Sequence, residues 1–180
     1  GAGGFITTGT PLVATATVSQ PSTLGDLDVV IDLSHTWVED LDVTLTAPNG
    51  TSVDLFSDVG GSGDDVDTTL DDEAATSIVS GTAPFTGTFQ PEGSLASFDG
   101  VSPVGTWTLT IVDDAGGDDG TLHSWSLILR EETADSDGDG FYTCDDCDDA
   151  AATSYPGAPE LCNGADDDCN GTVPGPELDG

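Results

Sequence analysis

The sequence has almost no positive charge. Arg130 is the single basic residue among 180, lysine is absent, and 35 acidic residues give a formal charge of −34 at pH 7. Such a chain repels nucleic acid and anionic membrane surfaces. We therefore exclude nucleic acid as a partner.

Long hydrophobic segments are also missing. No run approaches the roughly 20 apolar residues that cross a bilayer, so we expect no membrane insertion. Residues 1–10 carry neither an initiator methionine nor a basic-then-apolar export signal, and we interpret the chain as a mature form or a fragment. At this length, one domain of about 120–140 residues fits beside a small appendage.

Helical periodicity is missing over anything longer than about two turns. Up to Glu131, apolar and polar residues alternate in short runs, as in Leu27–Leu33, which places hydrophobic side chains on one face of a strand. The turn Asn49-Gly50 predicts an antiparallel hairpin over residues 41–56. Two further strands are expected at 107–111 and 125–129. The predicted fold class is therefore all-β, in a two-sheet sandwich.

The composition changes after Glu131, where the hydrophobic alternation stops. In the last 49 residues 14 are acidic, which leaves little to bury. We predict two domains, 1–131 and 132–180, with the second held together by crosslinks and ions.

All four cysteines lie in this acidic tail. An even number of cysteines in a short, loop-rich segment favours disulfides and an oxidising, extracellular location. The predicted disulfide cysteines are Cys144, Cys147, Cys162 and Cys169, and three pairings remain open. A zinc site at Cys144 and Cys147 is the competing interpretation, although the surrounding side chains offer hard oxygen ligands.

The run from Asp135 to Gly140 has the spacing of a calcium loop. Carboxylates occupy its alternate positions, and a glycine stands where such loops turn sharply. Two more acidic clusters follow, and uncompensated carboxylates at this density would repel one another. The expected Ca²⁺ ligands are Asp135, Asp137, Asp139, the carbonyl of Phe141, Asp146, Asp148, Asp149, Asp166 and Asp168. The alternative is a solvated acidic linker.

A second ion region is predicted in the first domain. The segment Asp58–Glu73 reads as one long loop that needs an ordering device. Its expected Ca²⁺ ligands are Asp64, Asp67, Asp71 and Asp72. A mobile, solvated loop is the alternative.

The two histidines give no clear sign of catalysis. A hydrolytic triad needs a histidine beside a nucleophilic serine and an orienting acid. His123 alternates in step with Trp125, which predicts a place in the core, and His35 is expected to hydrogen-bond a neighbouring loop. We predict a non-enzyme with no catalytic residues. We also expect Trp37, Trp107 and Trp125 in the core and Arg130 paired with a carboxylate.

The acidic tail resembles a known repeat. Its motifs are Asp135–Phe141, Asp146–Asp149, Tyr155–Gly164 and Asp167–Gly171. Together they resemble the cysteine- and aspartate-rich metal-binding repeat of secreted bacterial proteins, which is similar in style to thrombospondin type 3 calcium repeats. The resemblance implies calcium and disulfides.

The first domain resembles the P domain, or P/Homo B domain, of proprotein convertases and secreted bacterial proteases. The matching motifs are His35–Trp37, Asp40–Leu45, Ala47–Thr51, Gly105–Leu109, Val112–Asp114 and Gly120–Leu127. The resemblance covers residues 10–130. It implies a β-sandwich of jelly-roll type and a domain that assists or stabilises a neighbouring protease domain without being the protease itself.

Three functions are consistent with these features. The leading prediction is a secreted, calcium-binding structural or adhesion-type module without catalytic activity. The first alternative is an accessory P domain of a larger secreted subtilisin-like protease. The second is a repeating subunit of a calcium-stabilised extracellular filament. The expected partners are accordingly copies of the chain itself or an adjacent domain of a larger secreted protein.

Overall fold

The computed structural model describes residues 1–19, 24–131, 136–141, 147–148, 150–161 and 163–173. The chain divides into two compact units, Gly1–Glu131 and Glu132–Gly180. Within the described ranges, no helix has both the length and the apolar character needed to cross a membrane.

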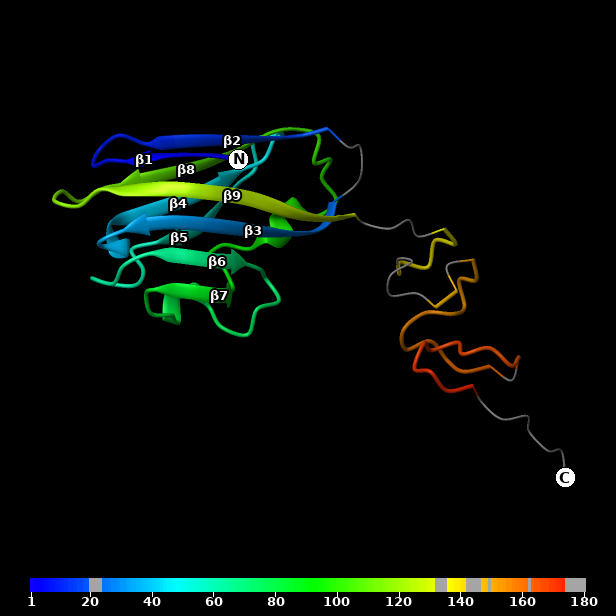
Figure 1. Ribbon diagram of the computed structural model, residues 1–180. Coiled ribbons are helices and arrows are strands. Elements are labelled where there is room, and N and C mark those ends of the chain that lie inside the picture. The colour runs from blue at the N-terminus through cyan, green and yellow to red at the C-terminus, as the bar shows by residue number, and fades with distance from the viewer. Residues whose placement is uncertain (20–23, 132–135, 142–146, 149, 162, 174–180) are drawn as a thin grey trace, which may run out of the picture. The chain divides into compact units, whose positions relative to one another are not determined.

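The first unit is a sandwich of two β-sheets (Figure 1). The five-stranded sheet has the order β1 (Ala2–Ile6), β9 (Gly120–Glu131), β3 (Leu24–His35), β6 (Val66–Leu70) and β7 (Phe85–Phe89). The four-stranded sheet has the order β2 (Leu12–Val18), β8 (Gly105–Asp113), β4 (Leu41–Thr46) and β5 (Ser52–Ser57). The helical segments of the described residues are three short 3₁₀ turns: η1 (Val38–Asp40), η2 (Ile78–Ser80) and η3 (Leu95–Phe98). The predicted all-β sandwich is confirmed.

The predicted hairpin is also confirmed. Strands β4 and β5 pair antiparallel, and Thr46 stands opposite Ser52 where the strands meet the turn. Gly50 has a φ of 90°, a left-handed conformation that glycine adopts at little cost. The Asn49 side chain accepts a hydrogen bond from the Thr51 N–H at 2.9 Å. Local turn chemistry therefore sets this pairing.

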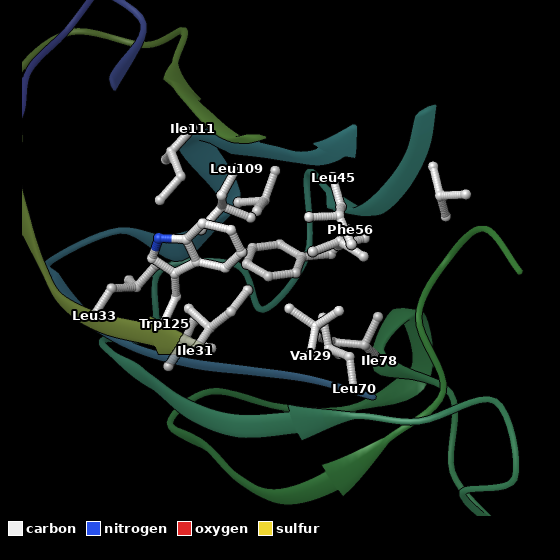
Figure 2. Packing of buried hydrophobic residues seen from close by; sticks show 14 of the residues in the cluster. Val29, Ile31, Leu33, Leu45, Phe56, Leu70, Ile78, Leu109, Ile111 and Trp125 are labelled. Atoms are coloured by element: carbon white, nitrogen blue, oxygen red, sulfur yellow. The ribbon is translucent and has the colours of Figure 1, made fainter. Parts of the chain in front are cut away.

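The hydrophobic core lies between the sheets. Figure 2 shows Val29, Ile31 and Trp125 of one sheet pointing toward Phe56 and Leu109 of the other. Trp107 and Trp125 are buried as predicted, at 0% and 2% exposed.

The prediction for Trp37 is wrong, because this side chain is 41% exposed. It follows the end of β3 and precedes η1, so no strand alternation directs it inward.

A bulge between β3 and β9 overturns the prediction for His123. Asp32 pairs with Ser124 while the next residue, Leu33, pairs with Leu122, so His123 is the extra residue on its strand. The shift changes the alternation, and Leu122 and Trp125 are both buried. His123 is therefore exposed rather than part of the core.

Arg130 forms the predicted ion pair at the end of β9. Its guanidinium contacts Asp26, and its Nη2 lies 3.0 Å from Asp28 Oδ2. Asp28 is 3% exposed. Burial raises the pKa of Asp28, and the nearby Arg130 charge partly opposes that effect.

Candidate functional site

His35 stands at the end of β3, where it joins two loops. Its ring Nδ1 lies 2.9 Å from the Trp37 carbonyl oxygen, and its backbone N–H donates to Asp65 Oδ1 at 3.1 Å. Its Nε2 is 3.7 Å from Asp113 Oδ2. His35 and Asp113 are 1% and 0% exposed. The predicted loop hydrogen bond is present, and this buried geometry gives His35 a structural role.

The segment 58–73 is not the single long loop that the sequence predicted. Val66–Leu70 form β6, which pairs with β3, so a strand orders this segment. Asp64 and Asp67 are exposed to solvent. Asp71 Oδ1 accepts a hydrogen bond from the Glu73 N–H at 2.7 Å, which makes a local turn.

Asp72 has a clear structural function at the start of η3. Its carboxylate accepts hydrogen bonds from the Ser94 hydroxyl at 2.8 Å, the Leu95 N–H at 3.1 Å and the Ala96 N–H at 2.9 Å. In the described part of the chain, the structure does not gather Asp64, Asp67, Asp71 and Asp72 into a group that could share one ion.

In the second unit, the segment from Ser136 to Phe141 winds through successive side-chain turns. The Asp139 N–H donates to Asp137 Oδ1 at 3.2 Å, and the Phe141 N–H donates to Asp139 Oδ1 at 2.9 Å. Gly138 and Gly140 adopt φ values of 82° and 95°, which explains the glycine at every second position. Phe141 stacks on Tyr155 with ring centroids 5.1 Å apart.

Asp167 is the centre of the hydrogen-bond network in the second unit. It is 0% exposed and accepts from the Leu161 N–H at 2.8 Å, the Asn163 amide at 2.9 Å and the Ser154 hydroxyl at 3.3 Å. The Asn163 bond, followed by the other two, lowers the pKa of Asp167. This carboxylate therefore organises the chain around it.

The neighbours of Asp167 in sequence belong to a second cluster. Carboxylate oxygens of Glu160, Asp166 and Asp168 all lie within 4.8 Å of one another. The Asp168 N–H donates to Glu160 Oε1 at 3.0 Å. The Asn170 N–H lies 3.1 Å from Asp166 Oδ1 and 3.2 Å from Asp168 Oδ1. The structure thus brings together two of the predicted ligands and adds Glu160.

Sequence spacing alone did not place Glu160 with this cluster. It stands outside the aspartate runs, and the turns around the buried Asp167 bring it to the cluster. Its Oε2 is shielded from solvent and accepts no hydrogen bond from the residues that the structure describes. Desolvation raises the pKa of Glu160, and the Asp168 and Asp167 carboxylates add to that effect, while the Asp168 N–H opposes it.

Of the remaining predicted site residues, some lie in the described part of the chain and the others lie outside it. Cys147 and Cys169 form a disulfide with a Cα–Cα distance of 5.6 Å, which confirms a disulfide in this unit. Asp148 is exposed, and its backbone carbonyl accepts from Ala150 and Ala151. Asp135, Asp146, Asp149, Cys144 and Cys162 lie outside the described residues.

Family comparisons agree with both units. Residues 24–129 match the family model of the proprotein convertase P-domain, and the chain belongs to that family. Residues 146–174 match the model of a metal-binding motif of the MopE copper-binding type.

The relatives of the chain are proteases. A calcium-dependent protease of Trichormus variabilis is 27% identical over 115 residues, which cover 62% of this chain and 15% of that protein. A transglutaminase-activating metalloprotease of Streptomyces mobaraensis is 32% identical over 120 residues, which cover 66% of this chain and 12% of that protein. The chain therefore spans less than a sixth of these relatives. A solved serine protease of Aeromonas sobria aligns with a TM-score of 0.47 and 23% identity over 69% of this chain and 24% of that one.

These relatives correct the leading functional prediction. A structural or adhesion-type module is wrong, because the P-domain relatives belong to proteases. The relatives support the alternative of an accessory P domain instead, and they give no support to a self-assembling filament subunit.

The side chains of the second unit can be compared with the ligands that each metal prefers. Copper sites draw on imidazole, thiolate or thioether ligands. Both histidines lie in the first unit and methionine is absent from the chain. Among the described residues, Cys147 and Cys169 are joined in a disulfide, while Cys144 and Cys162 lie outside the described residues. The cluster in the described residues offers carboxylate oxygens instead, which suit calcium, magnesium or manganese. The shielded Glu160 Oε2 fits a ligand atom for such a hard cation.

Proposed function

We propose that this chain is the accessory P domain, with an attached metal-binding segment, of a larger secreted protease. The observation that carries the proposal is the P-domain match over residues 24–129, together with relatives that are proteases several times longer than this chain. The buried histidine at the end of β3 supports a structural rather than a catalytic contribution. The disulfide supports an oxidising, extracellular location.

The accessory function predicts that a protease region encoded with this chain depends on it. We expect that region to fold in higher yield and to keep its proteolytic activity longer on heating when the 180-residue chain is present, since binding to the folded state stabilises it. The measurement is the half-life of peptide cleavage with and without the chain. Equal half-lives and yields, or a flanking coding sequence without a protease region, would show the proposal to be wrong.

We further propose that the second unit binds Ca²⁺ through Glu160, Asp166 and Asp168. Three carboxylates this close repel one another unless a cation or protons compensate them. The folded-state pKa of Glu160 is raised. Its protonated form therefore contributes stability that is fully present below the unfolded pKa of about 4.3 and is lost as pH rises through the folded value. At neutral pH, a divalent cation takes the place of the proton.

This proposal predicts opposite effects of Glu160→Gln with and without calcium. Glutamine keeps an oxygen for the Asp168 N–H but removes the charge. We expect the metal-free variant to unfold at a higher temperature than the wild type at pH 7. We also expect it to lose the calcium response, which for an intact site is about 2.7 kcal/mol at 100 times the dissociation constant.

The measurement for Glu160→Gln is thermal unfolding of the second unit, followed by tyrosine fluorescence, since both tyrosines of the chain, Tyr142 and Tyr155, belong to this unit. Glu39→Gln is the matched control, because Glu39 is exposed in the first unit, and it should respond to calcium as the wild type does. An unchanged calcium response in Glu160→Gln would contradict the proposed ligand. Stabilisation by copper and not by calcium would contradict the choice of metal.

A further inference from the structure

Charge is distributed very unevenly along this acidic chain. Residues 1–25 contain no charged side chain, and all 35 acidic residues lie from Asp26 onward. The uncharged segment forms β1 and β2, which are the end strands of the two sheets and lie side by side (Figure 1). An isolated bridge between Thr7 and Thr10 closes the turn that connects them. Both sheets therefore end, on this side of the sandwich, in a strand without charge.

Strand β2 has β8 as its one hydrogen-bonded strand partner among the described residues, since β1 belongs to the other sheet. It pairs with β8 through seven consecutive residues, Leu12 to Val18, without a register shift, and it ends the four-stranded sheet. Edge strands are commonly protected by charges, prolines, bulges or a covering segment, because an open edge can pair with another chain. The sequence of β2, LVATATV, contains no charge and no proline, and its ladder contains no bulge.

The end strands β5 and β7 differ from β2, the first because it is covered and the second because its backbone is irregular. Along β5, the Glu92 N–H donates to the Leu55 carbonyl at 2.9 Å and the Gly93 N–H donates to the Asp54 carbonyl at 2.8 Å. The Glu92 carboxylate also accepts from the Ser57 N–H at 2.9 Å, so a neighbouring segment covers this edge. Strand β7 (FTGTF) is also uncharged, but Gly87 at its centre has a φ of 103°, which departs from regular strand backbone. Strand β2 therefore differs from β5 in lacking a covering segment and from β7 in having a regular backbone.

Exposed side chains around β2 favour strand pairing. Val13 is 58% exposed on β2, and Phe5 on the adjacent β1 is 81% exposed. Thr15 and Thr17 are also exposed. Such β-branched and aromatic residues favour the pleated surface of a sheet. An added strand would also gain main-chain hydrogen bonds along its whole length.

We propose that the outer edge of β2 is the docking site for the protease region, which adds an uncharged extended segment as a further strand. The inference rests on the proposed accessory function. The lack of charge at this edge lets a neighbouring domain approach a chain that elsewhere carries all of its −34 charge. A second copy of the chain would bring an equal negative charge and be repelled, so the protease region is the occupant that the charge distribution favours.

The test introduces charge at the edge without touching the core. In the full 180-residue chain, Thr15→Lys with Thr17→Lys places two lysines on β2, and Thr86→Lys with Thr88→Lys is the matched control on β7, where both threonines are exposed. The probe is the purified protease region encoded with the chain. We expect the double variant to bind at least about tenfold more weakly and the control to bind as the wild type does. We also expect amide exchange in β2 to slow when the wild-type complex forms.

The outcomes separate the docking site from the accessory function. If the protease region is stabilised by all three chains and the β2 amides exchange as before, the docking site is wrong and the accessory function stands. If the protease region neither binds nor gains stability, both fail. If β2 becomes protected in the isolated chain as its concentration rises, a second copy occupies the edge, and the docking proposal is overturned.

Discussion

Replacing Trp107 with alanine is expected to destabilise the sandwich by about 3–5 kcal/mol, the usual cost of deleting a large aromatic side chain from a core. Trp107 is 0% exposed. Its ring packs edge-on against Phe98 with centroids 5.1 Å apart, and its Nε1–H donates to the Pro103 carbonyl at 2.9 Å. The substitution removes contacts between β8 and η3 and leaves that carbonyl without its donor.

Trp37→Ala is the matched control for Trp107→Ala. The same side chain is removed, but Trp37 is 41% exposed, so we expect a loss below about 1 kcal/mol. Urea unfolding followed by far-ultraviolet circular dichroism measures both variants. Similar losses for the two tryptophans would contradict the core described for the sandwich. Because the proposed accessory function needs a folded sandwich, Trp107→Ala should also weaken the stabilisation of the protease region.

Removing the disulfide of the second unit is expected to have the next largest effect. Cys147 and Cys169 are separated by 22 positions in the sequence. For a loop of this length, the chain-entropy model gives a stabilisation of about 3 kcal/mol. Ala158 is the one buried hydrophobic residue of this unit in the part that the structure describes. Little apolar burial remains to offset the loss, so the double variant Cys147→Ser and Cys169→Ser should unfold the second unit.

The first unit is the internal control for the disulfide variant. Its sheets contain no cysteine, so its unfolding transition should keep its midpoint while the second unit loses amide-exchange protection over residues 150–171. The calcium response assigned to Glu160 should disappear in the same variant, because the fold no longer gathers the carboxylates. Unchanged protection would mean that hydrogen bonds around Asp167 hold the unit without the crosslink.

The correction to the leading functional prediction shows where inference from composition fails. An acidic, calcium-loop-like tail on a β-sandwich is equally consistent with an adhesion module and with a protease accessory domain, because both need a soluble, ion-stabilised module. The motifs around His35, Asp40 and Trp107 carried the information that distinguishes them, since they match the P domain. The proposed function rests on family membership rather than on net charge.

The sequence by itself determined the features that depend on neighbouring residues. Alternation predicted the strands β3, β4, β8 and β9, and the Asn49-Gly50 turn predicted the hairpin, because side-chain period and turn geometry are local properties. The composition change at Glu131 predicted a separate acidic region. Aspartate spacing predicted Asp166 and Asp168 as ligands, and cysteine number predicted a disulfide without its pairing.

Only the tertiary structure decided the features that depend on residues far apart in sequence. The bulge at His123 arises from pairing with β3, and β6 exists because β3 and β7 flank it. Asp72 became a cap because η3 folds against it. Glu160 joined Asp166 and Asp168 because the buried Asp167 gathers the intervening turns. Register, burial and carboxylate grouping are set by packing between distant segments, which no local pattern encodes.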